Sequence, residues 1–428
     1  MKIAFYTLGC KVNQYETNEM RCRLRESGHT ITDAKDDADV YVVNSCTVTA
    51  ESSRKSRQAL RRLRSEHPDA ITVLTGCYSQ AFADEVSAFP EADIILGNKT
   101  NPLLEEKLEQ FIKDRQRITA VEPHRKEDLY CGGTVSDFEG HTRAYVKIQD
   151  GCNRYCTYCI IPKSRGFSRS KPLQDIQKEL DAIAANGYKE VVFVGINLSA
   201  YGLDTGYNIC DALELAQNTP GIERFRLGSL EPDHITDEVI ERLSKMDKFC
   251  PQFHLSLQSG SDTVLKRMNR HYDTAEYTRL CEKLKKAFPG LSLTTDIIVG
   301  FPGETEEYFR ESVEYAKKTG FMKVHVFPFS PREGTPAWNY PEKVTSGEKA
   351  ERCKILQTEC DKIREKFMES LTGKTEEVLF ETPKNGLQQG YTKNYTPVIL
   401  KSDTPLTGRI LKVKITGVSE DSCTAELI

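Results

Sequence analysis

The sequence predicts an α/β protein of three domains: an N-terminal parallel α/β sheet domain, a central partial barrel of six β/α units, and a small C-terminal β-barrel. Three observations lead to this prediction. Residues 1–112 alternate continuous apolar strands with amphipathic helices, and residues 141–370 repeat that alternation, which is typical of parallel sheets covered by helices. Residues 371–428 contain short strands punctuated by Gly, Pro and Asn. The polar, turn-rich residues 113–140 are predicted to be a linker.

The composition excludes several classes of protein. Hydrophobic residues make up 38% and charged residues 29% of the 428 positions, which provides enough apolar side chains for a core in each domain. No apolar run reaches the roughly 20 residues of a membrane span, and the N-terminus lacks the apolar stretch of a signal peptide. We therefore expect a cytoplasmic protein without a membrane partner. A net charge of -4 excludes a generally basic nucleic-acid binder, so any RNA contact must come from a local patch.

The central domain is expected to begin with the strand in "RAYVKIQDGC". A helical stripe of Ile176, Leu180 and Ile183 follows it and ends at the cap glycine Gly187. Six strands with helical crossovers favour a barrel smaller than the full eightfold one. The five further strands are expected at 190–195, 224–230, 253–258, 291–300 and 323–329.

A long helix is expected to lead from the central domain to the C-terminal one. It should run from 346 to 371, because Thr345 and Glu348 form a capping box and Gly373 ends it. The short strands beyond it are typical of a small β-barrel of the oligonucleotide-binding (OB-like) kind.

Three cysteines directly after the first central strand are the strongest chemical signal. Cys152, Cys156 and Cys159 have the spacing C-x3-C-x2-C, and the C-terminal edge of a parallel α/β sheet is where sites are built. Three thiolates on a [4Fe–4S] cluster leave one iron open for a chelating small molecule. The alternatives are a zinc site completed by a distant residue, for which the nearest histidine in sequence, His141, is poorly placed before the strand, and three buried structural cysteines.

The first domain is expected to place three more cysteines on one edge of its sheet. The strands "KIAFYTLGC", "ADVYVVNSC" and "AITVLTGC" end at Cys10, Cys46 and Cys77. The C-terminal ends of parallel strands share one edge, so we expect these thiolates to meet there and to hold a second cluster with an open iron. Three semi-buried structural cysteines are the alternative. The remaining eight cysteines are expected to pack as small hydrophobes: Cys22, Cys131, Cys210, Cys250, Cys281, Cys353, Cys360 and Cys423.

The C-x3-C-x2-C motif with Tyr158 before its last cysteine resembles that of radical S-adenosylmethionine enzymes. The resemblance implies that S-adenosylmethionine binds the open iron and is cleaved to a 5′-deoxyadenosyl radical. The stretches "VGINLSAYG", "LGSLEP", "SLQSGSD", "DIIVGFPGET" and "VFPFSPREGTPA" resemble, in order, the family's cosubstrate-binding strand ends. Ser199 and Gly228 depart from the common pattern. The residues that the resemblance implies for binding S-adenosylmethionine are Tyr158, Gly195, Asn197, Ser229, Glu231, Gln258, Ile298 and Phe327.

"SLQSGSD…LKRMNR" and "FPFSPREGTPA" narrow the resemblance to the methylthiotransferases. That branch implies an auxiliary [4Fe–4S] cluster on Cys10, Cys46 and Cys77, and an electron donor such as flavodoxin or ferredoxin. It further implies a two-stage reaction, in which one S-adenosylmethionine methylates a sulfur on this cluster and the radical from a second activates the substrate carbon. The cofactors carry this chemistry, so no side chain is assigned as a catalytic acid or base.

"LGCKVNQYETNEM" resembles the bacterial enzymes that act on N6-threonylcarbamoyladenosine in tRNA. The implied reaction adds a methylthio group to C2 of this base at position 37, next to the anticodon. Methylthiolation of isopentenyladenosine tRNA or of a ribosomal-protein aspartate is the alternative. A more remote alternative is a non-catalytic iron–sulfur sensor that binds RNA.

The C-terminal module resembles the TRAM domain, an RNA-binding β-barrel of tRNA-modifying enzymes. The expected partner is the anticodon stem-loop of tRNA. Tyr391 and Tyr395 flank Lys393 in "YTKNY", which suits base stacking with a phosphate contact, and Arg409 and Lys412 offer a local basic face. Alternatively, these tyrosines pack the barrel. The basic run "SRKSRQALRRLR" is either a second RNA-facing surface or a solvated helix face.

Overall fold

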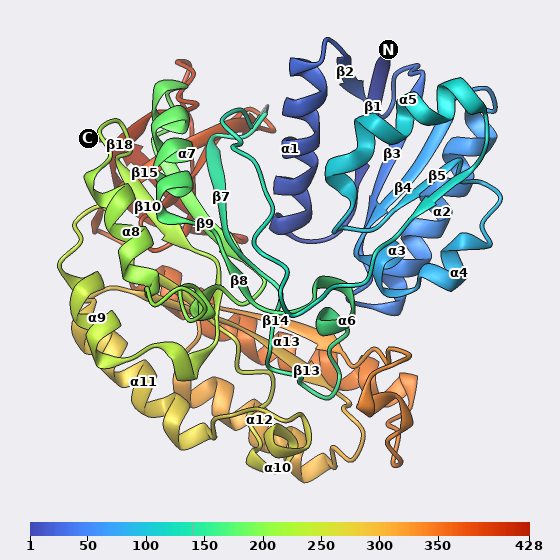
Figure 1. Cartoon of the computed structure of the whole chain (residues 1–428). Coiled ribbons are helices and arrows are strands. Elements are labelled where there is room, and N and C mark those ends of the chain that lie inside the picture. Colours follow the sequence, from blue (N-terminus) through green and yellow to red (C-terminus); the bar gives the residue numbers. More distant parts are fainter. Residues whose placement is uncertain (139) are drawn as a thin grey trace.

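The computed structural model describes residues 1–138 and 140–428, and it confirms the predicted fold class. The N-terminal domain is a six-stranded parallel sheet of order β2-β1-β3-β4-β5-β6 (Figure 1). Its strands are β1 (Lys2–Thr7), β2 (Thr30–Asp33), β3 (Val40–Ser45), β4 (Ile71–Gly76), β5 (Ile94–Leu96) and β6 (Ile118–Ala120). Strand β6 lies within residues 113–140, so part of the segment expected to be a linker extends this sheet.

Helices cover both faces of the N-terminal sheet. Apolar side chains of α1 and α5 pack on one face, and those of α2, α3 and α4 pack on the other. These helices are α1 (Lys11–Glu26), α2 (Ala50–Glu66), α3 (Cys77–Ala81), α4 (Ala83–Ser87) and α5 (Leu104–Asp114), with a 3-10 turn η1 (Asn101–Leu103) before α5.

The central domain is a partial barrel made of two four-stranded sheets, β10-β9-β7-β8 and β11-β12-β13-β14. All pairings are parallel except β7 with β8, and a bridge between Phe225 and Phe249 joins the sheets. The strands are β7 (Arg143–Asp150), β8 (Arg169–Ser170), β9 (Glu190–Gly195), β10 (Arg224–Leu227), β11 (Ser229–Leu230), β12 (Gln252–Leu255), β13 (Ser292–Val299) and β14 (Lys323–Pro328). The helices are α6 (Ile161–Arg165), α7 (Leu173–Ala185), α8 (Ile209–Asn218), α9 (Asp237–Ser244), α10 (Asp262–Arg267), α11 (Thr274–Ala287) and α12 (Glu306–Thr319), with 3-10 turns η2 (Leu198–Ala200), η3 (Pro232–His234) and η4 (Pro336–Asn339).

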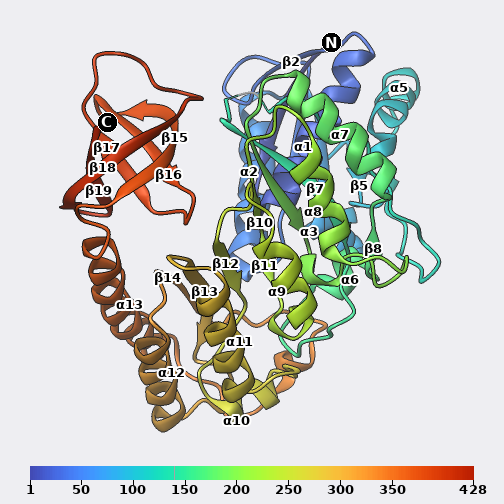
Figure 2. The same ribbon diagram turned by 90° about the vertical axis from the view of Figure 1, so that its left-hand side faces the viewer.

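Helix α13 (Ser346–Glu369) leads from the central domain to the C-terminal barrel (Figure 2). The Thr345 hydroxyl accepts from the Glu348 amide, and the Glu348 carboxylate accepts from the Thr345 amide, which forms the expected capping box. The closed barrel has the order β15-β16-β17-β19-β18. Its strands are β15 (Thr375–Lys384), β16 (Leu387–Thr392), β17 (Pro397–Leu400), β18 (Ile410–Ser419) and β19 (Ser422–Leu427). Among the described residues, no helix has the length and apolar character required to cross a membrane.

Residues 391–395, which we call the floor turn, comprise the last two residues of β16 and the first three of its connection to β17, and they close the N-terminal end of the central barrel. Arg224 and Arg226 of β10 donate to backbone carbonyls of the turn, at 3.1 Å to Tyr391 and 2.6 Å to Thr392. The hydroxyl of Ser292, the first residue of β13, donates to the carbonyl of Asn394 at 2.5 Å. The C-terminal barrel is therefore tied to the starts of the central strands as well as to α13.

Candidate active site

The structure brings Cys10, Cys46 and Cys77 to one edge of the N-terminal sheet. They follow the neighbouring strands β1, β3 and β4. The sulfurs of Cys10 and Cys77 lie 3.9 and 3.8 Å from Oδ1 of Asn13. Gly9, at φ +104°, lets Cys46 approach, because a Cβ at Gly9 would lie 3.0 Å from its sulfur. All three thiols are free of disulfide bonds, so three unbridged sulfurs lie at this edge of the sheet.

A buried arginine from the central domain contacts this edge. Nε of Arg165 donates to the sulfur of Cys77 at 3.1 Å, and the same guanidinium binds the Glu16 carboxylate and Oδ1 of Asn13. Burial raises the pKa of the Cys77 thiol to about 12, although the charge of Arg165 opposes this. A free thiol here is therefore protonated at neutral pH, and a cation must bind before the thiolate is favoured.

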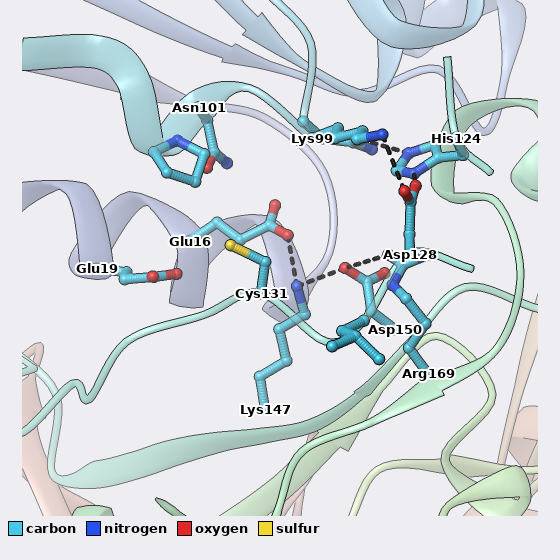
Figure 3. A pocket seen from close by; sticks show the side chains of 13 residues that line it. Glu16, Glu19, Lys99, Asn101, His124, Asp128, Cys131, Lys147, Asp150 and Arg169 are labelled. Atoms are coloured by element: carbon cyan, nitrogen blue, oxygen red, sulfur yellow. Dashed lines mark hydrogen bonds and ion pairs between the residues drawn. The ribbon is translucent and has the colours of Figure 1, made fainter. Parts of the chain in front are cut away.

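The Arg165 network continues through Lys147 of β7, which lies between Glu16 and Asp150 at 2.7 Å from each carboxylate (Figure 3). Burial alone would raise the pKa of Asp150, but the charges of Lys147, Arg165 and Arg169 hold it below its usual range. A cavity of about 180 Å³ opens beside this network (Figure 3). The boundary between the first two domains is thus a charged, hydrogen-bonded contact.

The loop after β7 carries Cys152, Cys156 and Cys159, and an arginine again contacts one of the sulfurs. Nη1 of Arg270 donates to the sulfur of Cys156 at 3.2 Å, and Nη2 of Arg270 binds the carboxylate of Glu231. Burial raises the pKa of Cys152 to about 11 and that of Cys159 further. Helix α6 directly follows this loop and ends at Arg165, so one short segment links the two cysteine sets.

Tyr158 lies in the cysteine loop itself, and the other residues expected to bind S-adenosylmethionine lie near the C-terminal ends of central strands or shortly after them. The ring of Tyr158 meets Phe301 edge-on. Asn197 is buried, and its Oδ1 has no hydrogen-bond partner among the described residues. Gln258 has φ +70°, an uncommon conformation for a residue other than glycine and one that clusters at ligand sites. The remaining members are Gly195 at the end of β9, Ser229 in β11, Glu231 after it, Ile298 in β13 and Phe327 in β14.

The five residues expected to contact RNA fall into two groups. Tyr391 and Tyr395 stack on each other with centroids 4.6 Å apart, and Arg143 lies over both rings. Nζ of Lys393 donates to the carbonyl of Asp247 at 3.3 Å. These three belong to the floor turn and are engaged within the protein. The other two, Arg409 beside β18 and Lys412 within it, are exposed.

The basic run 53–64 lies on α2, and its arginines face acidic partners. Arg54 pairs with Glu51, Arg57 with Glu85, Arg61 with Glu91, Arg62 with Glu66 and Arg64 with Asp93. These pairs reduce the net positive field of the helix, so the structure favours a solvated helix face.

Residues that the sequence analysis did not single out complete the site. Arg165 and Arg270 contact sulfurs from positions 88 and 114 residues away in the chain. Their only local signal was position, since Arg165 follows the cysteine motif and Arg270 ends "LKRMNR".

Comparison with known proteins agrees with this organisation. The family described as Radical SAM superfamily matches residues 146–316, Uncharacterized protein family UPF0004 matches 2–97, and TRAM domain matches 369–428. Among solved structures, the radical S-adenosylmethionine methyltransferase TsrM from Kitasatospora setae superposes with a TM-score of 0.60 over 95% of this chain and 82% of that one. At 14% identity this similarity concerns the fold alone.

Sequence relatives extend over the whole chain. The present chain is 41% identical over 420 residues to the Bacillus subtilis protein "Threonylcarbamoyladenosine tRNA methylthiotransferase MtaB", and the match covers 96% of this chain and 93% of the relative. Its identity to the Thermotoga maritima protein of the same name is 36% over 99% and 96% of the two chains. A Clostridium botulinum "tRNA-2-methylthio-N(6)-dimethylallyladenosine synthase" is 35% identical over the same shares.

The fold and the cysteine loop define a radical S-adenosylmethionine protein with a TRAM domain, and this class implies a [4Fe–4S] cluster and S-adenosylmethionine. More specifically, the chain belongs to the tRNA methylthiotransferase family.

Proposed function

We propose that the protein adds a methylthio group to C2 of N6-threonylcarbamoyladenosine at position 37 of tRNA, giving 2-methylthio-N6-threonylcarbamoyladenosine. The observation that carries this proposal is the pair of three-cysteine sets linked by α6, each with an arginine donating to a sulfur. The relatives named for this activity, at 41% and 36% identity over nearly the full length, support the choice of base over isopentenyladenosine.

The residues present fit two iron–sulfur clusters. Each set offers three free thiols and leaves one iron of a [4Fe–4S] cluster without a protein ligand. Arg165 and Arg270 supply N–H donors to the sulfurs, and such hydrogen bonds stabilise the anionic thiolates. Cys152, Cys156 and Cys159 hold the cluster that binds S-adenosylmethionine, and Cys10, Cys46 and Cys77 hold the auxiliary cluster.

When bound, the clusters and S-adenosylmethionine supply the one-electron cleavage and the sulfur-transfer chemistry. The residues of the chain position these groups. The unpartnered Oδ1 of Asn197 provides an acceptor for the cosubstrate, and the left-handed backbone at Gln258 supports the strand end that faces it. Gly195, Ser229, Ile298 and Phe327 complete the contacts, and Glu231 holds Arg270 against Cys156.

The anticodon stem-loop of tRNA is the proposed macromolecular partner, and Arg409 and Lys412 are its proposed phosphate contacts on the C-terminal barrel. A low-potential electron donor of the flavodoxin or ferredoxin type must reduce the cluster. Because the substrate is tRNA, we place the enzyme in the cytoplasm.

Nucleoside mass spectrometry of bulk tRNA tests the proposal. In a host lacking the gene, 2-methylthio-N6-threonylcarbamoyladenosine should disappear while N6-threonylcarbamoyladenosine accumulates, and the restored gene should reverse both changes. An unchanged level of the methylthio nucleoside, or loss of a methylthio-isopentenyladenosine instead, would refute the assignment of the base. Absence of 5′-deoxyadenosine when the reduced protein meets S-adenosylmethionine would refute the reaction class.

A further inference from the structure

The lumen of the central barrel contains a polar cluster outside both cysteine sets. Ligand atoms of His254, Asp296 and His325 all lie within 4.8 Å of one another. Nε2 of His254 is 3.3 Å from Oδ2 of Asp296, and Nδ1 of His254 is 3.0 Å from Oγ1 of Thr294. Nε2 of His254 is buried and has no well-formed hydrogen bond within the described part of the chain. Nε2 of His254 therefore keeps hydrogen-bonding capacity that its contact with Asp296 does not satisfy.

Strand register places this cluster one layer below the proposed cosubstrate site. Asp296 pairs with His325 across β13 and β14, and Ile298 pairs with Phe327 two residues further along. Two residues along a strand correspond to roughly 6 to 7 Å, and side chains two apart share a face. The cluster thus lies below the residues proposed to meet S-adenosylmethionine, in the space between the site of radical formation and the floor turn.

The charge around the cluster decides what it can bind. The ammonium of Lys11, the residue after Cys10, makes no hydrogen bond or ion pair with any described residue. Burial lowers the pKa of this ammonium, and the charges of Arg143 and Arg226 add to this while Tyr395 and Glu190 oppose it. The charge of Lys11 acts on His325, as does that of Lys323, while the carboxylate of Asp296 opposes them. Two ammonium groups against one carboxylate disfavour a divalent metal ion, although two histidines and a carboxylate are a known metal-binding set. The same balance favours an organic anion.

Burial lowers the pKa of His325, and the charges of Lys323, His254 and Lys11 add to this while Asp296 opposes it. His325 is therefore a neutral hydrogen-bonding group at physiological pH. The lumen thus combines an unpaired cation with groups that can both donate and accept hydrogen bonds.

We propose that Lys11, His254, Asp296 and His325 form the subsite that recognises the N6 substituent of the substrate adenosine. This inference rests on the proposed function and deepens it. The threonylcarbamoyl group carries a carboxylate, a hydroxyl and ureido N–H groups. Lys11 binds the carboxylate, Asp296 accepts from the hydroxyl or N–H donors, and the two histidines complete the hydrogen bonds. An isopentenyl group has none of these atoms and would leave the subsite unsatisfied, which costs affinity.

A charge-neutral substrate tests the role of Lys11. An anticodon stem-loop carrying N6-threonylcarbamoyladenosine is compared with the same RNA whose threonyl carboxylate is a methyl ester. The full-length protein with both clusters should use and bind the ester about 10- to 100-fold less well, the range expected for loss of one charge-assisted contact. Lys11→Gln should reduce kcat/KM for the acid by a similar factor and should remove the preference for it. Equilibrium binding, measured by fluorescence anisotropy, should change in parallel.

Several controls separate the possible failures. Lys113→Gln, an exposed lysine at the end of α5, should keep the wild-type kcat/KM, 5′-deoxyadenosine formation and preference for the acid, and the iron content of Lys11→Gln should show that both of its clusters are assembled. Asp296→Asn should weaken acid and ester alike. Equal use of acid and ester by the wild type, or a preference that survives Lys11→Gln, would overturn the inference while leaving the proposed function intact. Metal analysis is a further test. A non-iron divalent metal that is stoichiometric in the wild type and lost in Asp296→Asn would also overturn the inference. Absence of methylthio product from the stem-loop that carries the free threonyl carboxylate would overturn both this inference and the proposed function.

Discussion

Nε of Arg165 donates a hydrogen bond of 3.1 Å to the sulfur of Cys77, across the boundary between the central and N-terminal domains. The guanidinium is fully buried and is also held by Glu16 and Asn13. Arg165 ends the helix that follows Cys159, so this side chain directly links the segment of one cysteine set to a cysteine of the other.

Replacement of this arginine should destabilise the protein. Arg165→Met leaves the buried carboxylate of Glu16 with Lys147 as its main partner, and breaking a buried ion pair on one side costs about 3–5 kcal/mol. Urea unfolding followed by circular dichroism measures the loss. Arg165→Lys, which keeps the charge, should lose less; an equal loss for both variants would show that packing, and not charge, dominates.

Loss of one auxiliary cysteine should remove one cluster. Cys77→Ala should reduce bound iron from about eight to about four atoms per chain, because each [4Fe–4S] cluster contributes four. Reductive cleavage of S-adenosylmethionine should persist, since the other cysteine loop is intact, but methylthio product should be absent. Iron assay and nucleoside analysis measure the two effects. The exposed Cys131 offers a matched control, and full iron content in Cys77→Ala would refute the auxiliary site.

Arg270→Met should make the cluster of the cysteine loop harder to reduce. The arginine donates to Cys156 at 3.2 Å, and a cationic donor to a cluster sulfur stabilises the more negative, reduced state. Loss of such a partner commonly costs 10- to 100-fold in activity, so 5′-deoxyadenosine formation should fall by about that factor, with a lower midpoint potential in a redox titration followed by electron paramagnetic resonance. The exposed Arg279→Met should leave the potential unchanged. An unaltered potential in Arg270→Met would contradict the assignment.

The C-terminal barrel should contact RNA through β18 and its start. Arg409→Ala combined with Lys412→Ala should weaken tRNA binding and should reduce the slope of log affinity against log salt by about 2, close to one per lost phosphate contact. Filter binding over a salt series gives this slope. Lys393→Ala should change it less, because that ammonium already bonds the carbonyl of Asp247. The reverse order of effects would assign RNA binding to the floor turn.

The sequence predicted those parts of the site that local pattern determines. Each auxiliary cysteine ends an apolar strand, and parallel strands share an edge, so their convergence followed from residues close in the chain. The contacts of Arg165 with Cys77 and of Arg270 with Cys156 depend on how distant segments pack, which local periodicity does not encode. The lumen cluster was missed for the same reason: His254, Asp296 and His325 are single polar residues on three strands, and only the strand register brings them together.

The floor turn is another part of the structure whose contacts local sequence pattern does not determine. Two tyrosines around a lysine suit both RNA stacking and packing, and in the structure Arg143 lies over both rings while Lys393 contacts the central domain. Whether the turn also meets RNA stays a prediction. Strand β6 was missed because three residues in a polar segment give no strand periodicity.

Because the floor turn is anchored, the C-terminal barrel holds a fixed position relative to the central barrel. The end of β16 and the turn after it are bonded to β10 and to the start of β13, and α13 connects the barrel to the central domain from the other side, so the exposed face of β18 stands at a constant offset from the lumen. An RNA stem bound to that face can place in the lumen only the nucleotide that lies at one particular distance along its backbone. Selection of a single base among many adenosines then depends partly on distance, which the hydrogen-bonded contact between the two barrels sets before any base edge is recognised.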